Sequence, residues 1–510
     1  MKLSLIRYIS AAAALVFSTN MQAAVPNPHG IAHVIMISVD GMHAFDLEQF
    51  IAKHPESALS GLAKSGIEYR QAMTVAPADS FPGLLALVTG GTPAVTGVYF
   101  DVTYDSRLSA PGSDCSTLGT VVSYDEAVDI PATESHGAAI NPALLPRDPN
   151  GCVPVFPHSY LRTNTIFDVI HEAGGYTAWI DKHPVYEIVN GPSGTGVDDL
   201  WTPEIGGDFE GSTHKSDASI TSSLKLTEAY DRSKVEGLIN EIKGLQHDGK
   251  QPAPVPALMG LNLQAVNVGQ KLSGYMSASG KPSDQIENAL LNCDQLIGQV
   301  TTALEKQNLL DSTLIVVTAK HGNGPINPRT LRRIDKHKLI NVIESDAPGT
   351  LMHVTSDRSA LIWIKEEAMT RKVAHILENH ATTLGIQRVL YGSRLRTYFH
   401  VSQPDSRIPD ILVIPQSGVI YTKTGDSKRV EHGGVSTNDR HVALLLSNPQ
   451  LQHAGTANKT PVATTQVAPT ILAVLGLSAD KLQAVVMEKT KELPGEDWAA
   501  NAGHGLPSGK

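Results

Sequence analysis

Five polar residues in this sequence have side chains that can attack an electrophilic centre, hold a metal ion or bind an anion. Ser80 carries a hydroxyl that becomes a nucleophile when a base takes its proton. Asp40, His321 and His432 offer a carboxylate and two imidazoles, which are bases and also zinc ligands. Lys320, next to His321, offers a positive charge. These residues are far apart in the sequence, so only the fold can bring them together.

Polar residues follow three apolar runs that are typical of strands buried on both faces. In open α/β sheets, ligands bind beyond the carboxyl ends of the strands, so these residues are candidates for one common site. The runs are 32–39, 256–262 and Leu314–Thr318, and the polar residues at their ends are Asp40, Asn262 with Gln264, and Lys320 with His321.

Ser80 opens a predicted helix over residues 80–88, followed by Phe81-Pro82-Gly83. The free N–H groups and the dipole of a helix N-terminus favour an anion or a developing oxyanion. We therefore interpret Ser80 as a nucleophile, although a serine at this position can also be an ordinary helix cap.

Strands alternate with helices along the chain, which predicts an α/β fold with a central, mostly parallel sheet sandwiched by helices. The expected helices are 58–65, 80–88, 163–173, 284–308 and 466–477, and the further strands are 176–180 and 442–446.

A separate stretch, 351–420, has a strand at Leu361–Ile364, a helix at 366–384 and a strand at Ile411–Ile414. We interpret it as a smaller inserted α+β cap. The expected organisation is a signal peptide (1–24), a core (25–350 and 421–495), the cap (351–420) and a flexible tail (496–510).

The N-terminus carries Lys2 and Arg7, an apolar run over Ile9–Phe17, and small residues up to Ala24. This order is typical of a secretory signal peptide, so we expect an exported protein, periplasmic or secreted. No later stretch reaches about 18 uninterrupted apolar residues, so we expect no transmembrane segment in the mature protein.

Export permits a disulfide between Cys115 and Cys152, which the sequence leaves open, with Cys293 as a core thiol.

The composition is that of a soluble globular protein. Of 510 residues, 41% are hydrophobic and 18% charged, which excludes a disordered chain and a multi-span membrane protein. Asp and Glu number 51 against 41 Lys and Arg, for a net charge of −10. That acid excess argues against a binder of nucleic-acid duplexes, which needs a basic face.

The order of these motifs resembles the alkaline phosphatase superfamily, and within it the type I phosphodiesterase / nucleotide pyrophosphatase family. That family has a metal-binding Asp after the first strand, a Thr or Ser nucleophile before Phe-Pro-Asn, an Asp-x-x-x-His pair, an Asp-His-Gly and a final His-Gly. The matching segments here are Asp40-Gly41, Ser80-Phe81-Pro82-Gly83 with Thr89-Gly90, Lys320-His321-Gly322, Arg407-Ile408-Pro409-Asp410 and His432-Gly433.

The resemblance implies a metal site with Asp40, Ser80, His321 and His432 as ligands, and an alkaline-phosphatase-like fold. Family members use two zinc ions, and here we expect a divalent metal, zinc, with one ion rather than two. A metal-free Ser–Lys arrangement stays open, because Asp40, Ser80 and His321 barely meet zinc's need for three or four ligands. Asp79 and Asn323 are the other ligands at hand.

The sequence departs from the family pattern at three places. Lys320 replaces the Asp of the Asp-His pair, and Gly83 stands where the family commonly has a phosphate-binding Asn. The Asp-x-x-x-His pair falls on Gln264 and Val268 in one register and on Val266 and Gln270 in another, and neither restores a ligand. Lys320 would then supply positive charge where a metal is lost, or act as the base of Ser80.

The resemblance implies hydrolysis of phosphate esters, of the phosphodiesterase or nucleotide pyrophosphatase type, through a covalent phospho-enzyme on Ser80. Lys320 and His432 are the other expected catalytic residues, and Lys320, Gln264 and Asn262 are expected to contact a small-molecule phosphate or sulfate ester. A sulfatase-like enzyme and a degenerate member that binds an anionic ligand or partner without catalysis are the alternatives. The polar strand end Asp181-Lys182-His183 has two interpretations, a lining of the pocket or a solvated loop, and we expect the solvated loop.

Overall fold

The computed structural model describes residues 30–130, 138–203 and 220–498. The predicted signal peptide (1–24) and residues 499–510 of the predicted tail lie outside the described residues. No helix within the described ranges is long and apolar enough to cross a membrane.

An eight-stranded sheet forms the centre of the core, in the order β11-β10-β12-β1-β13-β20-β2-β21. All neighbouring pairs are parallel except those of β20, which runs antiparallel to β13 and β2. The α/β fold with a mostly parallel sheet is therefore confirmed. The strands are β1 (His33–Val39), β2 (Gly66–Tyr69), β10 (Ala178–Ile180), β11 (Asp199–Trp201), β12 (Leu258–Leu263), β13 (Thr313–Thr318), β20 (Leu444–Ser447) and β21 (Thr456–Asn458).

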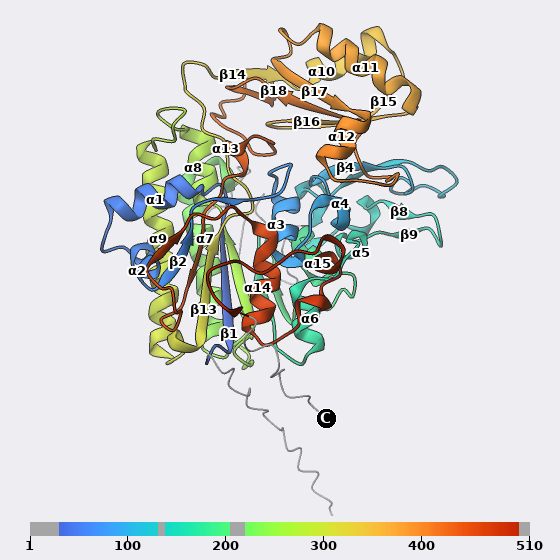
Figure 1. Cartoon of the computed structure of the whole chain (residues 1–510). Helices are drawn as coiled ribbons and strands as arrows, with labels where there is room; N and C mark the ends of the chain where they lie inside the picture. Colours follow the sequence, from blue (N-terminus) through green and yellow to red (C-terminus); the bar gives the residue numbers. More distant parts are fainter. Residues whose placement is uncertain (1–29, 131–137, 204–219, 499–510) are drawn as a thin grey trace, which may run out of the picture.

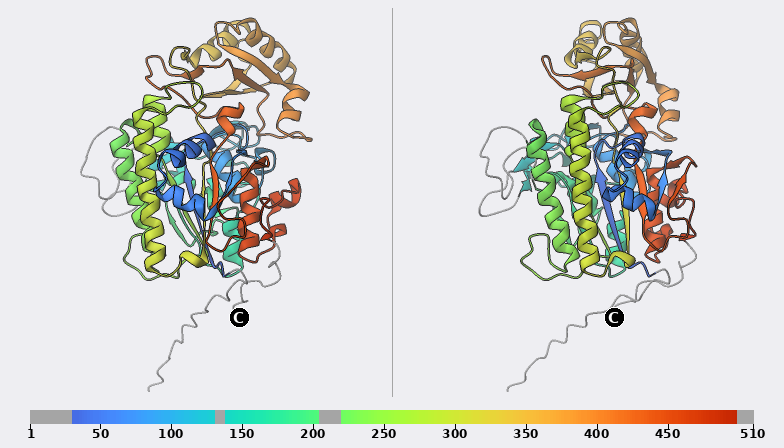
Figure 2. Two further views of the ribbon diagram at one scale, coloured as in Figure 1. Left: turned by 60° about the vertical axis from the view of Figure 1, so that its left-hand side comes forward. Right: turned by 90° about the vertical axis from the view of Figure 1, so that its left-hand side faces the viewer.

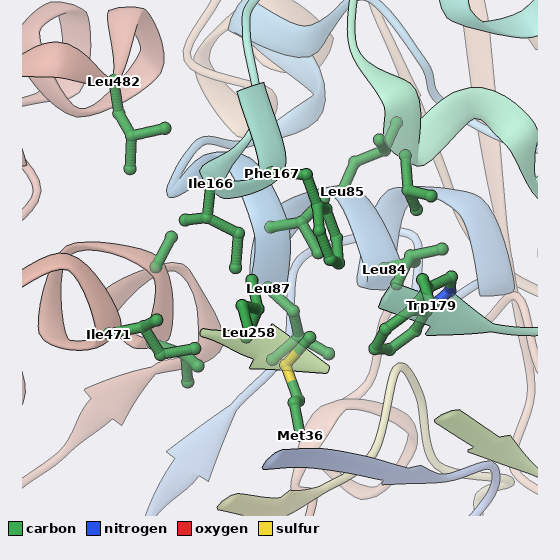
Figure 3. Close-up of a cluster of buried hydrophobic side chains, with 14 of the residues drawn as sticks. Met36, Leu84, Leu85, Leu87, Ile166, Phe167, Trp179, Leu258, Ile471 and Leu482 are labelled. Carbon is green, nitrogen blue, oxygen red and sulfur yellow. The ribbon is translucent and has the colours of Figure 1, made fainter. Parts of the chain in front are cut away.

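Helices cover both faces of this sheet, because successive side chains of a strand point to opposite faces. Val34 and Met36 of β1 pack on one side with α3 (Ser80–Thr89), α6 (Ile166–Glu172) and α14 (Val467–Val474) (Figure 3). Ile35 and Ile37 pack on the other side with the long helices α7 and α9, which run next to each other (Figure 2). The helices of this second layer are α1 (Ala44–Lys53), α2 (Ala58–Lys64), α7 (Leu224–Ile242), α8 (Ala265–Ser273) and α9 (Asp284–Lys306).

A second, antiparallel sheet in the order β15-β16-β18-β17 forms the cap, which lies over the end of the core (Figure 1). A hydrophobic cluster on one face of this sheet includes Ile334, Leu339 and Tyr421. We therefore propose cap boundaries near 332 and 422, wider than 351–420. Its elements are β14 (Arg332–Asp335), α10 (His337–Asp346), β15 (Leu351–Ser356), β16 (Ala360–Ile364), α11 (Glu367–Asn379), β17 (Ile386–Tyr391), α12 (Gly392–Tyr398), β18 (Ile411–Pro415) and β19 (Val419–Thr422).

The loop-rich region after α3 contains short hairpins and the disulfide Cys115–Cys152, while Cys293 is free and buried. The remaining strands and α-helices are short: β3 (Ala72–Met73), α4 (Pro93–Thr96), β4 (Val102–Asp105), β5 (Thr120–Ser123), β6 (Asp129–Ile130), β7 (Ala139–Ile140), β8 (Arg147–Asp148), β9 (Val153–Pro154), α5 (Pro157–Tyr160), α13 (Thr437–Arg440), β22 (Val462–Ala463) and α15 (Gln483–Glu488).

Glu241 of α7 carries a buried carboxyl group whose oxygens have no hydrogen-bond partner among the described residues. Burial, with the nearby Asp199, raises the pKa of Glu241 well above its usual 4.5, so the folded chain keeps a proton there. Because the folded pKa exceeds the unfolded one, this group lowers the free energy of unfolding as the pH rises above 4.5.

We therefore expect Glu241→Gln to equal the parent in stability at about pH 4 and to exceed it by roughly 1–2 kcal/mol at about pH 8. Urea denaturation at both pH values measures this difference. Glu305→Gln, at an exposed position of α9, is the control. An equal difference at both pH values would contradict the prediction.

Candidate active site

The ends of three central strands meet at one level of the sheet. Ser38 of β1 pairs with Asn262 of β12 on one side and with Thr318 of β13 on the other. Because the strands are parallel, Asp40, Gln264 and Lys320, each two residues further along, leave the sheet at the same edge and side by side. The cap lies over this end of the core, where the N–H of Arg358 donates to the carbonyl of His432.

Asp40 is completely buried and its two carboxylate oxygens accept hydrogen bonds from side-chain amides. Asn262 Nδ2 donates to Oδ1 and Gln264 Nε2 donates to Oδ2, both at 2.7 Å. Burial by itself raises the pKa of a carboxyl group, but Lys320, His321 and Lys182 outweigh it and hold the pKa of Asp40 well below its usual range. Asp40 is thus a buried carboxylate anion, and Asn262 and Gln264 direct their donors to it.

The long helix α7, which the sequence did not predict, holds the backbone that carries Asn262 and Gln264. Asp231 accepts from the backbone N–H groups of Gln264 and Ala265 at the start of α8. Lys234, paired with Asp231 at 3.2 Å, donates to the carbonyl of Asn262. A buried ion pair in the second layer therefore sets the position of the residues that hold Asp40.

Ser80 is the first residue of α3 and is 4% exposed. Its Oγ lies 3.3 Å from His321 Nε2 and 3.4 Å from Lys182 Nζ. Burial, together with His432, holds the pKa of His321 well below its usual value, so this imidazole is neutral and can accept the Ser80 proton. The N–H groups at the start of α3 are not free, because Asp79 caps the helix and accepts from Phe81 N.

The prediction that Asp181-Lys182-His183 is a solvated loop is wrong. Asp181 and His183 are buried, and the Lys182 side chain is 13% exposed, with its Nζ 3.8 Å from Asp40 Oδ2. Burial alone would lower the pKa of Lys182, but Asp40 and other carboxylates outweigh it and raise the pKa. Lys182 is therefore an ammonium ion between Asp40 and Ser80.

Lys320 is fully buried and forms an ion pair with Asp181. Its Nζ lies 2.9 Å and 3.1 Å from the two oxygens of Asp181, and 4.2 Å from the centre of the Tyr186 ring. Burial lowers the pKa of Lys320, and Asp181 opposes this shift. Lys320 is thus held by Asp181 and the Tyr186 ring.

Gly83 has no room for a side chain. A Cβ at this position would lie 2.0 Å from the backbone oxygen of Lys320 and 2.6 Å from its carbonyl carbon. Helix α3 therefore passes directly against the Lys320 backbone, and the phosphate-binding Asn of the family cannot be accommodated here.

We expect Gly83→Ala to lower the free energy of unfolding by at least about 2 kcal/mol, because backbone atoms must shift. Gly61→Ala is the matched control, since Gly61 also lies inside a helix and a Cβ there meets nothing within 4 Å. That control should be neutral or slightly stabilising. Thermal unfolding of both variants tests this, and equal melting temperatures would refute it.

His432 lies beside His321, with ring centroids 4.4 Å apart and an interplanar angle of 18°. Its Nδ1 lies 2.7 Å from Glu431 Oε1 and its Nε2 3.4 Å from Asp79 Oδ1. Burial and the nearby Lys271 lower the pKa of His432 to about 4, although Glu431 opposes this. The structure therefore brings together all seven predicted site residues: Asp40, Ser80, Asn262, Gln264, Lys320, His321 and His432.

Two further carboxyl groups, those of Asp79 and Asp357, lie near His432, and Asp101 interacts electrostatically with both of them. Burial and Asp357 raise the pKa of Asp79 to about 7, burial and Glu431 raise the pKa of Asp357 to about 8, and burial and Asp79 raise that of Asp101 well above its usual value. Glu431 differs, because Lys271 and Lys428 outweigh its burial and hold its pKa well below the usual range. Asp79 and Glu431 are notable in the sequence, beside Ser80 and His432, whereas Asp101 and Asp357 belong to no local motif.

The residues around Asp40 do not fit the zinc ion that the resemblance implies. Both oxygens of Asp40 accept from amides, His321 Nε2 is 3.9 Å from Oδ2, and the Lys182 ammonium lies on the same oxygen. An ammonium and two amide N–H groups are donors, not metal ligands. Asn323 Nδ2 donates to Asn267 and Gln270, while its Oδ1 is buried without a hydrogen-bond partner among the described residues.

The fold places a serine at a helix N-terminus, next to the polar ends of the central strands. The structure resembles ectonucleotide pyrophosphatase / phosphodiesterase 5 from mouse (16% identity, 88% of this chain and 96% of that chain, TM-score 0.57) and the alkaline phosphatase PafA (14% identity, 88% and 96%, TM-score 0.59). It also resembles an inactive variant of the mouse protein in complex with AMP (15% identity, 93% and 99%, TM-score 0.55). No curated protein matches the sequence.

Residues 34–439 match the model of a protein family described as type I phosphodiesterase / nucleotide pyrophosphatase. The chain belongs to the type I phosphodiesterase / nucleotide pyrophosphatase family. It is a phosphoric ester hydrolase by this membership.

Proposed function

We propose that this protein is an exported phosphodiesterase of the nucleotide pyrophosphatase type, with Ser80 as the nucleophile. The observation that carries the proposal is the position of Ser80 Oγ, 3.3 Å from His321 Nε2 and 3.4 Å from Lys182 Nζ. A neutral imidazole and an ammonium ion on one hydroxyl are the groups that remove its proton and attract an anionic ester.

In the first step, Ser80 Oγ attacks phosphorus and its proton passes to His321 Nε2. The new Oγ–P bond forms as the P–O bond to the leaving group breaks, and the leaving group takes a proton from the site or from water. Water then attacks the phospho-serine, the Oγ–P bond breaks, and Ser80 regains a proton. Lys182, supported by Lys320, offsets the negative charge that accumulates on the phosphoryl oxygens.

Two positive charges close to one serine favour a substrate with an anionic phosphoryl group. The similarity to a protein crystallised with AMP supports a nucleotide ester as the substrate class. Asn262 and Gln264 would act on such a substrate through Asp40, to which their N–H groups already donate.

Export is supported by two observations. The N-terminal sequence has the order of a signal peptide, and the chain carries a disulfide between Cys115 and Cys152. Disulfides persist in the periplasm and outside the cell and are rare in the cytosol. Expression of the full chain, followed by fractionation and N-terminal sequencing of the product, tests this; an uncleaved cytosolic protein would contradict export.

The activity test is a panel of bis-p-nitrophenyl phosphate, p-nitrophenyl phosphate, p-nitrophenyl sulfate and a dinucleotide, each with chelator and with added Zn²⁺ or Mn²⁺. We expect the fastest turnover with the phosphodiesters. Preference for the sulfate would identify a sulfatase-like enzyme instead, and no turnover of any ester would reject the hydrolase mechanism.

The second candidate is a degenerate family member that binds an anionic ligand without catalysis. It is favoured by the amides and the ammonium on Asp40, where the family holds zinc, and by the burial of Ser80. Calorimetry with AMP separates the two candidates. Binding that depends on Lys182 in a protein inert to every ester supports this second function.

A further inference from the structure

We propose that Tyr186 is a positioning residue of the active site, whose ring holds the ammonium groups of Lys182 and Lys320 and whose hydroxyl group holds Ser80. This inference rests on the proposed function, because it takes Ser80 as the nucleophile. Tyr186 lies outside the motifs that carry the family resemblance, and its role follows from contacts in the folded chain.

Tyr186 lies between the strand end that carries Lys182 and the helix that carries Ser80. It belongs to a 3₁₀ helix over Pro184–Asn190, which follows β10. The residue is 1% exposed, and Phe81 packs against it with ring centroids 4.9 Å apart and planes tilted by 35°. Because Phe81 follows Ser80 on α3, Tyr186 is in contact with the helix that carries the nucleophile.

The face of the Tyr186 ring is shared by two ammonium groups. Lys320 Nζ lies 4.2 Å and Lys182 Nζ 5.5 Å from the ring centre. Both distances are within the range of about 6 Å in which the negative face of an aromatic ring attracts a cation, and burial strengthens this attraction. Because like charges repel, the shared ring lowers the free energy of keeping the two lysines close together.

The ring attracts Lys182 without forming an ion pair. A carboxylate in the same place would pair with the ammonium group, as Asp181 does with Lys320. An aromatic face has no net charge, so it holds Lys182 without adding a negative charge that would compete with an anionic ester. The Tyr186 ring thus supports the positive charge on which the proposed mechanism depends.

The hydroxyl group of Tyr186 forms a hydrogen bond with the Ser80 side chain. A phenol keeps its proton at neutral pH, and burial raises the pKa of Tyr186 further. When the Ser80 proton passes to His321, the phenol O–H is therefore able to donate to the negative charge that develops on Ser80 Oγ. A base, an ammonium group and a neutral donor then act together on one oxygen.

Tyr186→Phe and Tyr186→Leu separate the role of the hydroxyl group from that of the ring, with steady-state kinetics on bis-p-nitrophenyl phosphate as the measurement. Tyr186→Phe keeps the ring, so kcat should fall about tenfold while KM stays within about twofold of the parent. Tyr186→Leu also removes the ring, so KM should in addition rise roughly fivefold. An unchanged kcat in Tyr186→Phe would overturn the role of the hydroxyl group.

A second test needs no turnover. It is a double-mutant cycle of Tyr186 and Lys182, measured by calorimetry with AMP. Tyr186→Leu should weaken AMP binding roughly fivefold in the parent, whereas Tyr186→Phe should leave it unchanged. In the Lys182→Met background, the effect of Tyr186→Leu should be below about twofold, because the ammonium group is already absent.

Equal effects of Tyr186→Leu in both backgrounds would overturn the role of the ring, and so would a parent that binds no AMP. A coupled cycle in a protein that hydrolyses no ester would reject Ser80 as the nucleophile and still support the role of the ring. Failure of the proposed function is therefore distinguished from failure of this inference.

Tyr69→Phe and Tyr69→Leu are the matched controls, since Tyr69 of β2 is also 1% exposed and its hydroxyl group donates to the carbonyl of Pro494. Both should keep the kinetics and the AMP affinity of the parent, and melting temperatures show whether each variant is folded. If Tyr186→Leu is unfolded, pentafluorophenylalanine at position 186 takes its place, because it keeps an aromatic ring and removes the negative ring face.

Discussion

Ser80→Ala is expected to lower kcat for a phosphodiester by at least about 10³-fold, because removal of a nucleophile leaves only binding and electrostatic effects. The fold should be unaffected, since Ser80 Oγ contacts site residues and not the hydrophobic core. Single-turnover assays with bis-p-nitrophenyl phosphate measure the rate.

Ser65→Ala, at the end of α2, is the control for this variant and should keep full activity. A second readout is trapping of the covalent intermediate: the parent, quenched in acid during turnover, should carry phosphate on Ser80, and the variant should carry none. A Ser80→Ala protein that turns over as fast as the parent would show that another group attacks phosphorus.

Lys182→Met is expected to lower kcat/KM by roughly 10²–10³-fold, the range found when one group that stabilises transition-state charge is removed. Methionine has similar length and no charge, so the change isolates the ammonium ion that lies 3.4 Å from Ser80 Oγ. Steady-state kinetics with the same diester measure the effect, and Lys225→Met, at an exposed position of α7, is the control.

Comparison with Lys320→Met tests which lysine acts on the substrate. Lys320 is paired with Asp181, so its removal should have a smaller effect on kcat/KM and a larger one on stability, because it leaves a buried carboxylate unpaired. If Lys320→Met lost more activity than Lys182→Met, the assignment of the direct contact to Lys182 would be wrong.

The central strands and the helices next to the site follow from local patterns in the sequence. Continuous apolar runs predicted β1, β12 and β13, and the predicted helix at Ser80 is α3. Helix α7 escaped prediction because buried Asp231, Lys234 and Glu241 interrupt its apolar face. Strands β15 and β17 of the cap escaped it because their exposed and buried residues do not alternate, so that neither segment shows the period of two typical of a strand.

Local patterns pointed to a site residue where it follows a strand or opens a helix, while His432 was found through the His-Gly motif of the family resemblance. Asp40, Ser80 and His321 meet that condition. Lys182 also follows a strand, but its partners Asp40 and Ser80 lie more than 100 residues away in the sequence. Without a partner nearby in the sequence, its charge was expected to lie in solvent. Asp357 has no local signal, and what makes it notable is the closeness of its carboxylate to Glu431 and His432 in the folded chain.

The close approach at Gly83 also bears on the rigidity of the chemistry. Ser80 stands one turn before Gly83 on α3, and His321 follows the Lys320 carbonyl that leaves no space for a Cβ. Ser80 and His321 therefore belong to two backbone segments in direct contact, and neither segment can shift without the other. This contact keeps the reorganisation of the Ser80–His321 pair small during the reaction, so the pair is already aligned for proton transfer when an ester binds.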